Sequence, residues 1–171
     1  MQTAIRIKTV TPQRLVAVPV RTTAFEIGAA LADALARVWS HLARQESVTV
    51  GPAIARYLRT DADDILLEAG FATAESPPVE SPFVIRELPG GPAATMIVHG
   101  SYAQLPAAFE ELEAWMGANG HTAAEPPWEI YWVDSSHAAS EAELRTELVW
   151  PIRDRGAAGS AADRRAPRQG A

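Results

Sequence analysis

The strongest constraint on the fold of this chain is an internal repeat. Four pairs of landmarks occur in the same order in two halves: Trp39 and Trp115, Pro52 and Pro126, Tyr57 and Tyr131, and Glu68 and Glu147. Because each landmark is an independent coincidence, the repeat of residues 4–73 and 83–152 is stronger evidence than any single motif. It predicts two copies of one folding unit.

Hydrophobic spacing predicts the same order of elements in both halves: strand, helix, then two strands. In the first half we expect strands at 4–10 and 14–21, a helix at 24–43, and hairpin strands at 53–59 and 65–73. In the second half we expect two strands within 83–100, a helix after Ser101 that ends near Gly117 and Gly120, and hairpin strands at 126–134 and 143–152.

These elements predict an α+β fold. Two strand–helix–strand–strand units pair about a pseudo-twofold axis, giving an antiparallel sheet with both helices on one side. Small-molecule sites commonly form at such seams, so a central ligand cleft is expected where the two units meet. Residues 1–152 form this domain, residues 74–82 with three prolines form an extended linker within it, and residues 153–171 form a flexible tail.

Cysteine is absent from the chain, which excludes disulfides, zinc–thiolate sites, iron–sulfur clusters and thiol nucleophiles. The four histidines show no ligand spacing. We therefore expect neither a metal site nor another cofactor.

The charge distribution argues against nucleic-acid binding. Net charge is −6, and the segment 153–171 contains five arginines against two aspartates, so the rest of the chain is more acidic still. An acidic body does not neutralise phosphates. No apolar stretch approaches the length of a membrane span, and we expect a cytoplasmic protein.

The second predicted hairpin holds three of the five tryptophans together with Tyr131, Glu129 and Glu147. Strand alternation puts Glu129 and Tyr131 on the face opposite Trp128. If the register pairs Tyr131 with Glu147, a carboxylate lies beside an aromatic wall, where a lipophilic cation supplies the missing charge.

Each candidate in the hairpin also has a structural interpretation. Glu129 is interpreted as a solvated strand carboxylate, with Arg145 as a possible ion-pair partner, and the tryptophans as core. Glu147, whose counterpart in the repeat is Glu68, is interpreted as the functional acid. Tyr102, which opens the second helix, suits either the cleft or the core.

Three segments together resemble the GyrI-like, or bacterial transcription-activator effector-binding, domain: YLRTDADDILLEAGF, LPGGPAATMIVHGSYAQLPAAFEELEAW, and PPWEIYWVD with ELRTELVWPI. The resemblance covers about Ile5 to Ile152. It implies a duplicated fold with a central cleft, multidrug sensing in bacterial regulators, and a buried glutamate that contacts lipophilic cations among aromatic side chains. The ligand-binding residues that the resemblance implies are Glu147, Tyr131, Trp128 and Tyr102. The internal repeat adds Glu68 and Tyr57, the counterparts of Glu147 and Tyr131.

Three functions follow as hypotheses. The first is a stand-alone protein that senses or sequesters amphipathic cations, since no DNA-binding domain precedes Ile5. The second, also implied by the family, is a hydrolase of cyclopropane-bearing genotoxic compounds in which Glu147 activates water. The third is an inhibitor whose acidic surface binds a protein partner.

Overall fold

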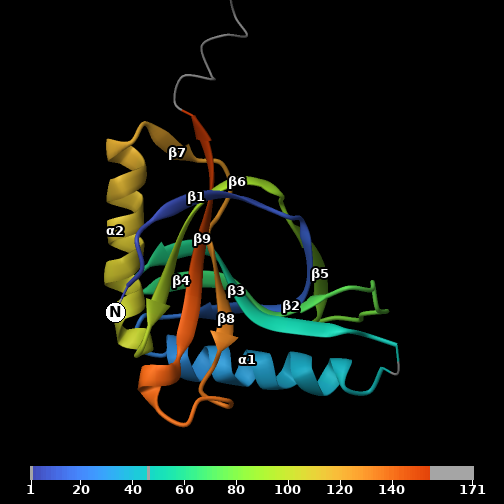
Figure 1. Cartoon of the computed structure of the whole chain (residues 1–171). Coiled ribbons are helices and arrows are strands. Elements are labelled where there is room, and N and C mark those ends of the chain that lie inside the picture. Colours follow the sequence, from blue (N-terminus) through green and yellow to red (C-terminus); the bar gives the residue numbers. More distant parts are fainter. Residues whose placement is uncertain (1, 46, 155–171) are drawn as a thin grey trace, which may run out of the picture.

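The computed structural model describes residues 2–45 and 47–154 (Figure 1). Its helices are α1 (Ile27–Leu42) and α2 (Leu105–Ala118), with short 3₁₀ turns at Tyr102–Gln104 and Glu141–Glu143. Its strands are β1 (Arg6–Val10), β2 (Gln13–Thr22), β3 (Val50–Asp61), β4 (Asp64–Thr73), β5 (Val84–Leu88), β6 (Gly91–His99), β7 (His121–Ala123), β8 (Trp128–Val133) and β9 (Arg145–Asp154).

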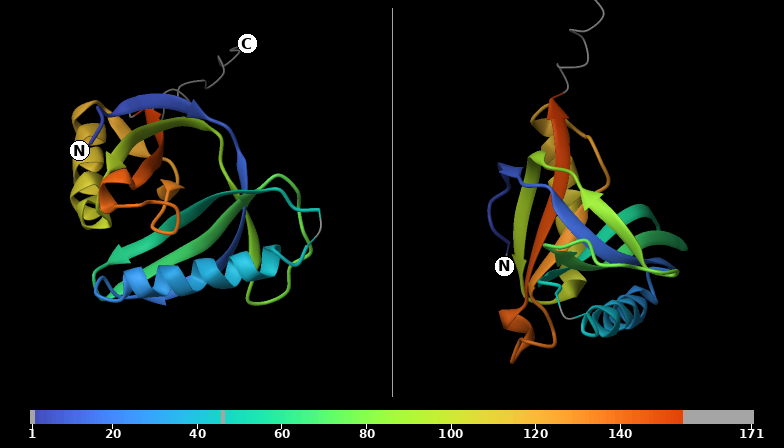
Figure 2. Two further views of the ribbon diagram at one scale, coloured as in Figure 1. Left: turned by 60° about the horizontal axis from the view of Figure 1, so that its bottom comes forward. Right: turned by 90° about the vertical axis from the view of Figure 1, so that its right-hand side faces the viewer.

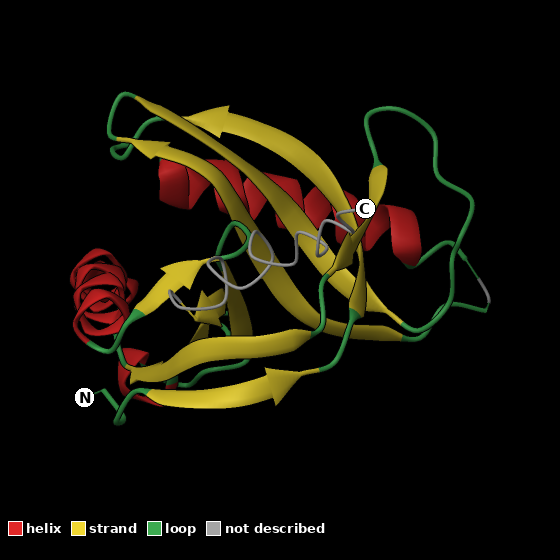
Figure 3. Cartoon of the chain, turned by 90° about the horizontal axis from the view of Figure 1, so that it is seen from above, coloured by secondary structure: helices red, strands yellow, loops and turns green. Residues whose placement is uncertain are grey.

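The strands form one antiparallel sheet in the order β1-β6-β9-β8-β3-β4-β2-β5, with β7 paired to β9. Each half contributes a strand, a helix and a hairpin, and the two hairpins meet where β3 pairs with β8. Strands β1 and β5 each precede one of these units in sequence but pair with a strand of the other unit. Strand β1 pairs with β6, and β5 pairs with β2. Figures 2 and 3 show that the resulting sheet is strongly curled.

The register at the β3–β8 junction agrees with the repeat. Three neighbouring pairs lie there: Ile54 with Ile130, Ala55 with Glu129, and Arg56 with Trp128. In the repeat, Ile54, Ala55 and Arg56 correspond to Trp128, Glu129 and Ile130. If each residue is replaced by its counterpart, the pair Ile54–Ile130 becomes the pair Arg56–Trp128, and the pair Ala55–Glu129 becomes itself. The pair Ala55–Glu129 therefore lies at the centre of the pseudo-twofold arrangement, while descent from a duplicated sequence stays a prediction.

Both helices pack on the same face of the sheet, as expected. Alternation along the strands decides this face, because alternate side chains of β2, β4, β6 and β9 are apolar and buried. The cluster under α1 includes Val16, Val18, Leu67, Ala69, Ala34, Val38 and Leu42. The cluster under α2 includes Met96, Val98, Leu148, Leu105, Ala108, Leu112 and Met116.

The opposite face has its own core, enclosed by the curl of the sheet. It contains Leu15, Ala17, Ile54, Leu88, Ala93, Trp128, Ile130 and Val149. Successive side chains of one strand thus pack alternately into the two cores. This is expected because successive side chains of a strand point to opposite faces and this sheet is buried on both.

Several bounds differ from those predicted. Helix α1 starts three residues later than expected, because Thr23–Glu26 form a turn in which the Thr23 hydroxyl accepts a hydrogen bond from the Glu26 amide. The β3–β4 hairpin is longer and its turn tighter, and β7 was not anticipated. Strand β9 continues to Asp154, and the rest of the predicted tail lies outside the described residues. In the described part, neither helix is long and apolar enough to cross a membrane.

Candidate functional site

A cavity of about 1440 Å³ lies on the helix face of the sheet, across the junction of the two halves. Helices α1 and α2, strands β3 and β8, Trp150 of β9 and the loops at 123–127 and 134–137 line it. A smaller hollow of about 760 Å³ lies beside the 75–83 loop and the end of α1. The larger cavity is the better candidate, because it alone has a buried carboxylate in its wall.

Glu129 supplies that carboxylate. Alternation along β8 turns both Glu129 and Tyr131 toward the helices, and Glu129 is only 2% exposed. The Tyr131 hydroxyl donates a hydrogen bond to Glu129 Oε2, and the Tyr57 hydroxyl also hydrogen-bonds this carboxylate. Burial raises the pKa of Glu129 to about 7, against the lowering effect of the two tyrosine hydrogen bonds.

Of the two tyrosines, Tyr131 is buried and Tyr57 is partly buried. Burial raises the pKa of Tyr57 and of Tyr131 well above their usual value, and the nearby Glu129 charge adds to both shifts. Both hydroxyls therefore stay protonated at neutral pH and remain hydrogen-bond donors. The two tyrosines occupy equivalent positions in the repeat, one on each side of the acid.

Aromatic rings form much of the remaining wall. Tyr102 meets Tyr131 edge-on with centroids 5.7 Å apart, and Phe109 contacts Tyr57 at 5.8 Å and Trp150 at 6.1 Å, also edge-on. These rings come from β3, β8, β9, α2 and the 3₁₀ turn that leads into α2. The site thus combines a buried acid with π faces, which both attract cations.

Two other glutamates are as deeply buried as Glu129, but each has a basic partner. Glu147 is 5% exposed and accepts hydrogen bonds from Lys8 Nζ at 2.5 Å and Trp132 Nε1 at 2.9 Å. Glu68 is 3% exposed; Arg86 donates to it at 2.6 Å and Arg56 at 3.4 Å.

Both of these glutamates lie on the sheet face opposite the helices, and neither lines the cavity. Among the described residues, an ion pair is found for Glu68 and Glu147 but none for Glu129.

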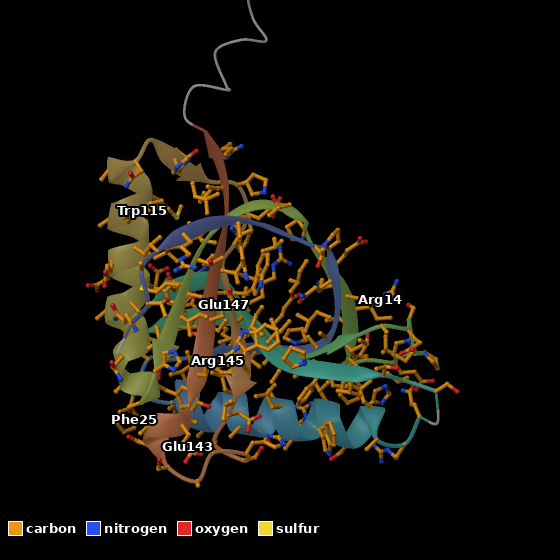
Figure 4. The ribbon with its side chains drawn as sticks, viewed as in Figure 1. Arg14, Phe25, Trp115, Glu143, Arg145 and Glu147 are labelled. Carbon is orange, nitrogen blue, oxygen red and sulfur yellow. The ribbon has the colours of Figure 1, made fainter. Side chains whose placement is uncertain are left out.

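The structure separates the predicted site residues into two groups. Tyr57, Tyr102 and Tyr131 line the cavity together. Glu68, Glu147 and Trp128 do not, and Trp128 is part of the core inside the curl. Figure 4 shows Glu147 on β9 with Arg145 on the same strand.

The register explains why Glu147 is absent from the cavity wall. Tyr131 pairs with Thr146, and Glu147 pairs with Ile130, so the pairing of Tyr131 with Glu147 considered from the sequence is wrong. A shift of one residue moves a side chain to the other face. Interpreting Glu129 as a solvated carboxylate was also wrong, since it is buried against the helices.

Sequence reasoning missed Phe109 and Trp150 as cavity residues. Both signals were present, because Phe109 belongs to the apolar stripe of α2 and Trp150 shares a strand face with Leu148. The apolar stripe of α2 does not by itself show that some of its residues line a cavity while others pack in the core.

A metal centre finds no support in this arrangement. In the part of the chain that the structure describes, no three histidine, aspartate or glutamate side chains are grouped to hold a metal ion. The chemistry open to the cavity is charge neutralisation at Glu129, hydrogen bonding by tyrosine hydroxyls, and proton transfer to or from a carboxyl group whose pKa is near 7.

Comparison with protein families gives one match. The GyrI-like small molecule binding domain matches residues 3–153. No curated protein sequence matches the chain.

Solved structures share the fold at low sequence identity. The crystal structure of the EcmrR C-terminal domain has a TM-score of 0.79 and 17% identity, covering 88% of this chain and 98% of that one. A longer EcmrR chain, in a cryo-EM structure of an EcmrR–DNA complex, has a TM-score of 0.77 and 19% identity over 88% of this chain. The chain spans 57% of the length of that EcmrR chain.

Two more solved structures share the fold. SAV2435 bound to tetraphenylphosphonium has a TM-score of 0.62 and 11% identity, covering 88% of this chain and 94% of that one. A hydrolase from Listeria innocua has a TM-score of 0.57 and 14% identity, covering 87% and 91%.

Proposed function

This chain belongs to the GyrI-like small molecule binding domain family, and we propose that it binds bulky amphipathic cations in the cavity between α1 and α2. Glu129 supplies the counter-charge and the aromatic wall supplies apolar contact area. In the cell, such binding serves to sense or to sequester these compounds.

The observation that carries this proposal is the contrast between Glu129 and the other two buried glutamates. A buried carboxylate is costly unless it is paired, and Lys8, Arg56 and Arg86 pair with the other two. Among the described residues, the hydrogen-bond partners of Glu129 are tyrosine hydroxyls and none is basic, so Glu129 either takes up a proton or binds a cation from outside. The cavity at its side gives such a cation access.

The aromatic rings favour cations that are large and apolar. A cation over the face of an aromatic ring gains about 0.5–2 kcal/mol, most when it is desolvated. Glu129 already accepts hydrogen bonds from tyrosine, which suits a cation without donors of its own. SAV2435, a protein of the same fold, binds a cation of this kind, tetraphenylphosphonium.

Titration of tryptophan fluorescence with tetraphenylphosphonium and with neutral triphenylphosphine oxide tests the proposal, because Trp150 lines the cavity. We expect saturable binding that prefers the cation. Glu129→Gln keeps the shape and removes the charge, so it should weaken cation binding at least about tenfold, or 1.4 kcal/mol, and leave the neutral compound little changed.

Glu147→Gln is the matched control, since it removes an equally buried carboxylate that lies outside the cavity. Its affinity for tetraphenylphosphonium should equal that of the parent. The proposal is abandoned if Glu129→Gln binds the cation as well as the parent does, or if Glu147→Gln is the variant that loses binding.

A hydrolase is the second candidate, and the pKa of Glu129 favours it. A general base works best when its pKa is close to the working pH, and burial raises that of Glu129 to about 7. Glu129 would take a proton from water as the water oxygen attacks a strained ring carbon. The carbon released by ring opening would then receive the proton.

Mass spectrometry of a cyclopropane-bearing electrophile incubated with the protein separates the two functions. A product heavier by one water, formed by the parent and not by Glu129→Gln, would establish a hydrolase. Unchanged ligand recovered from a saturated complex would leave binding alone.

A further inference from the structure

We infer that Gly28 and Ala32 of α1 set the largest ligand that the cavity admits. This inference rests on the proposed binding function and adds the residues that limit ligand size. It concerns the part of the cavity wall that α1 forms.

The wall formed by α1 contains a row of very small residues beside a row of larger ones, which are Ile27, Leu31, Leu35 and Trp39. The small residues that line the cavity are Gly28, Ala32 and Ala36. Residues four apart lie above one another on a helix, so these three form one row along the helix surface. Gly28 and Ala32 are exposed, which means that space rather than protein lies in front of them.

Packing does not explain the glycine in this row. A Cβ added at Gly28 would meet no atom within 4 Å, and its backbone does not adopt a positive φ. Glycine is less favourable than alanine inside a helix. Neither a close neighbour nor the backbone conformation requires glycine at this position, and the effect that remains is to leave the cavity open.

The opposite wall is bulky. Phe109 and Glu113 of α2 line the cavity, and Phe109 is held in place by edge-on contacts with Tyr57 and Trp150. The width of the cavity at this point therefore depends on the row of Gly28, Ala32 and Ala36, where no side chain extends beyond Cβ. The total of about 1440 Å³ exceeds the roughly 300–1,000 Å³ typical of ligand pockets.

A second observation, the buried acid in the same cavity, indicates that the space beside the small residues holds a ligand. Glu129 is 2% exposed, lines this cavity, and has no basic partner among the described residues. An acid without a basic partner in the cavity wall indicates a ligand that carries the opposite charge. The small residues of α1 then limit how large the apolar part of that ligand can be.

Leucine at either position tests the inference, because leucine is a good helix former and extends into open space. Gly28→Leu and Ala32→Leu should weaken tetraphenylphosphonium binding at least about tenfold. The compact cation tetraethylammonium should lose less than about threefold, so the ratio of the two affinities changes.

Ala29→Leu is the matched control, since Ala29 is exposed on the same helix and does not line the cavity. It should bind both cations as the parent does. Thermal melts of all variants show whether each is folded, and if a leucine variant is not, Gly28→Ala and Ala32→Val must show the same shift in preference to a smaller degree.

The outcomes distinguish this inference from the proposed function. If the parent binds neither cation, the proposed function fails first. If the parent binds tetraphenylphosphonium and the cavity-facing variants keep the parent's ratio of affinities, the function stands and the role of Gly28 and Ala32 is refuted. The same holds if Ala29→Leu shifts the ratio equally.

Discussion

Three glutamates are buried in one sheet, and their immediate neighbours decide what each can do. Glu68 and Glu147 are neutralised by arginine or lysine, so their carboxylates can stay charged and hold strands together. Glu129 is surrounded by tyrosine hydroxyls and open space. At the scale of single residues, Glu129 therefore differs from the other two in having no basic partner among the described residues.

The raised pKa of Glu129 predicts a pH-dependent stability. Its folded pKa of about 7 lies above the ordinary value of 4.5, so the folded state holds the proton more tightly than the unfolded state does. The stabilisation is complete below about pH 4.5 and is lost as the pH rises through about 7.

Urea unfolding of the parent and of Glu129→Gln at several pH values measures this effect. Between about pH 4.5 and 7, the free energy of unfolding of the parent should fall by up to about 3 kcal/mol relative to the variant, which cannot titrate. Parallel pH profiles for the two proteins would contradict the raised pKa.

At the scale of elements, the exchanged strands hold the two halves together. Strand β1 belongs to the first half in sequence, yet it pairs with β6, and Lys8 reaches past β6 to Glu147 on β9. Strand β5 does the same in the other direction, with Arg86 reaching Glu68 on β4. Each buried glutamate opposite the helices thus fixes an edge strand that comes from the other unit.

Lys8→Met tests this role. It leaves Glu147 buried with only the Trp132 hydrogen bond, and because Lys8 is about half exposed, we expect a moderate loss of about 1–2 kcal/mol in chemical unfolding. Adding Glu147→Gln should recover part of that loss, and cation affinity should be unchanged in both variants. A double variant less stable than Lys8→Met would count against the ion pair.

Glycines in two elements predict opposite responses to alanine. A Cβ on Gly70 of β4 would lie 1.8 Å from the Val16 carbonyl oxygen of β2, so Gly70→Ala must push two strands apart and should destabilise the protein by about 1–3 kcal/mol or more. Gly28→Ala on α1 meets nothing and should stabilise it by about 0.5–1 kcal/mol. Equal melting temperatures for the two variants would contradict the surroundings described here for Gly70 or for Gly28.

At the scale of the whole molecule, the cavity belongs to neither half alone. Its acid and Tyr131 come from the second hairpin, while Tyr57 and the α1 wall come from the first half. A ligand in this position contacts both units and should stabilise the entire fold rather than one element.

Thermal unfolding with tetraphenylphosphonium measures this stabilisation. At a ligand concentration 100 times the dissociation constant, the gain is about 2.7 kcal/mol, which for a chain of this size raises the melting temperature by roughly 5–10 °C. At the same ligand concentration Glu129→Gln should show a much smaller rise. An equal rise in both proteins would mean that the cation binds elsewhere.

The sequence by itself determined the two long helices, the strands other than the short β7, and their order. Local spacing fixes them, since a period of two or of three to four residues is a property of neighbouring positions. The same spacing put Glu129 and Tyr131 on one face of their strand, and both line the cavity. The landmark pairs of the repeat agree with the register at the β3–β8 junction. Residues 3–153 also match the family that the motifs indicated.

Only the tertiary structure decided which acid faces the cavity. Alternation shows which residues of β8 share a face and which residues of β9 share a face. Whether Glu129 and Glu147 lie on the same face of the sheet depends on the register between the two strands, and a shift of one residue reverses the answer. The counter-charges Lys8 and Arg86 come from edge strands exchanged between the halves, far from their glutamates in sequence. Pairing between distant segments is settled by the fold as a whole, and it left Glu129 as the buried carboxylate without a basic partner among the described residues.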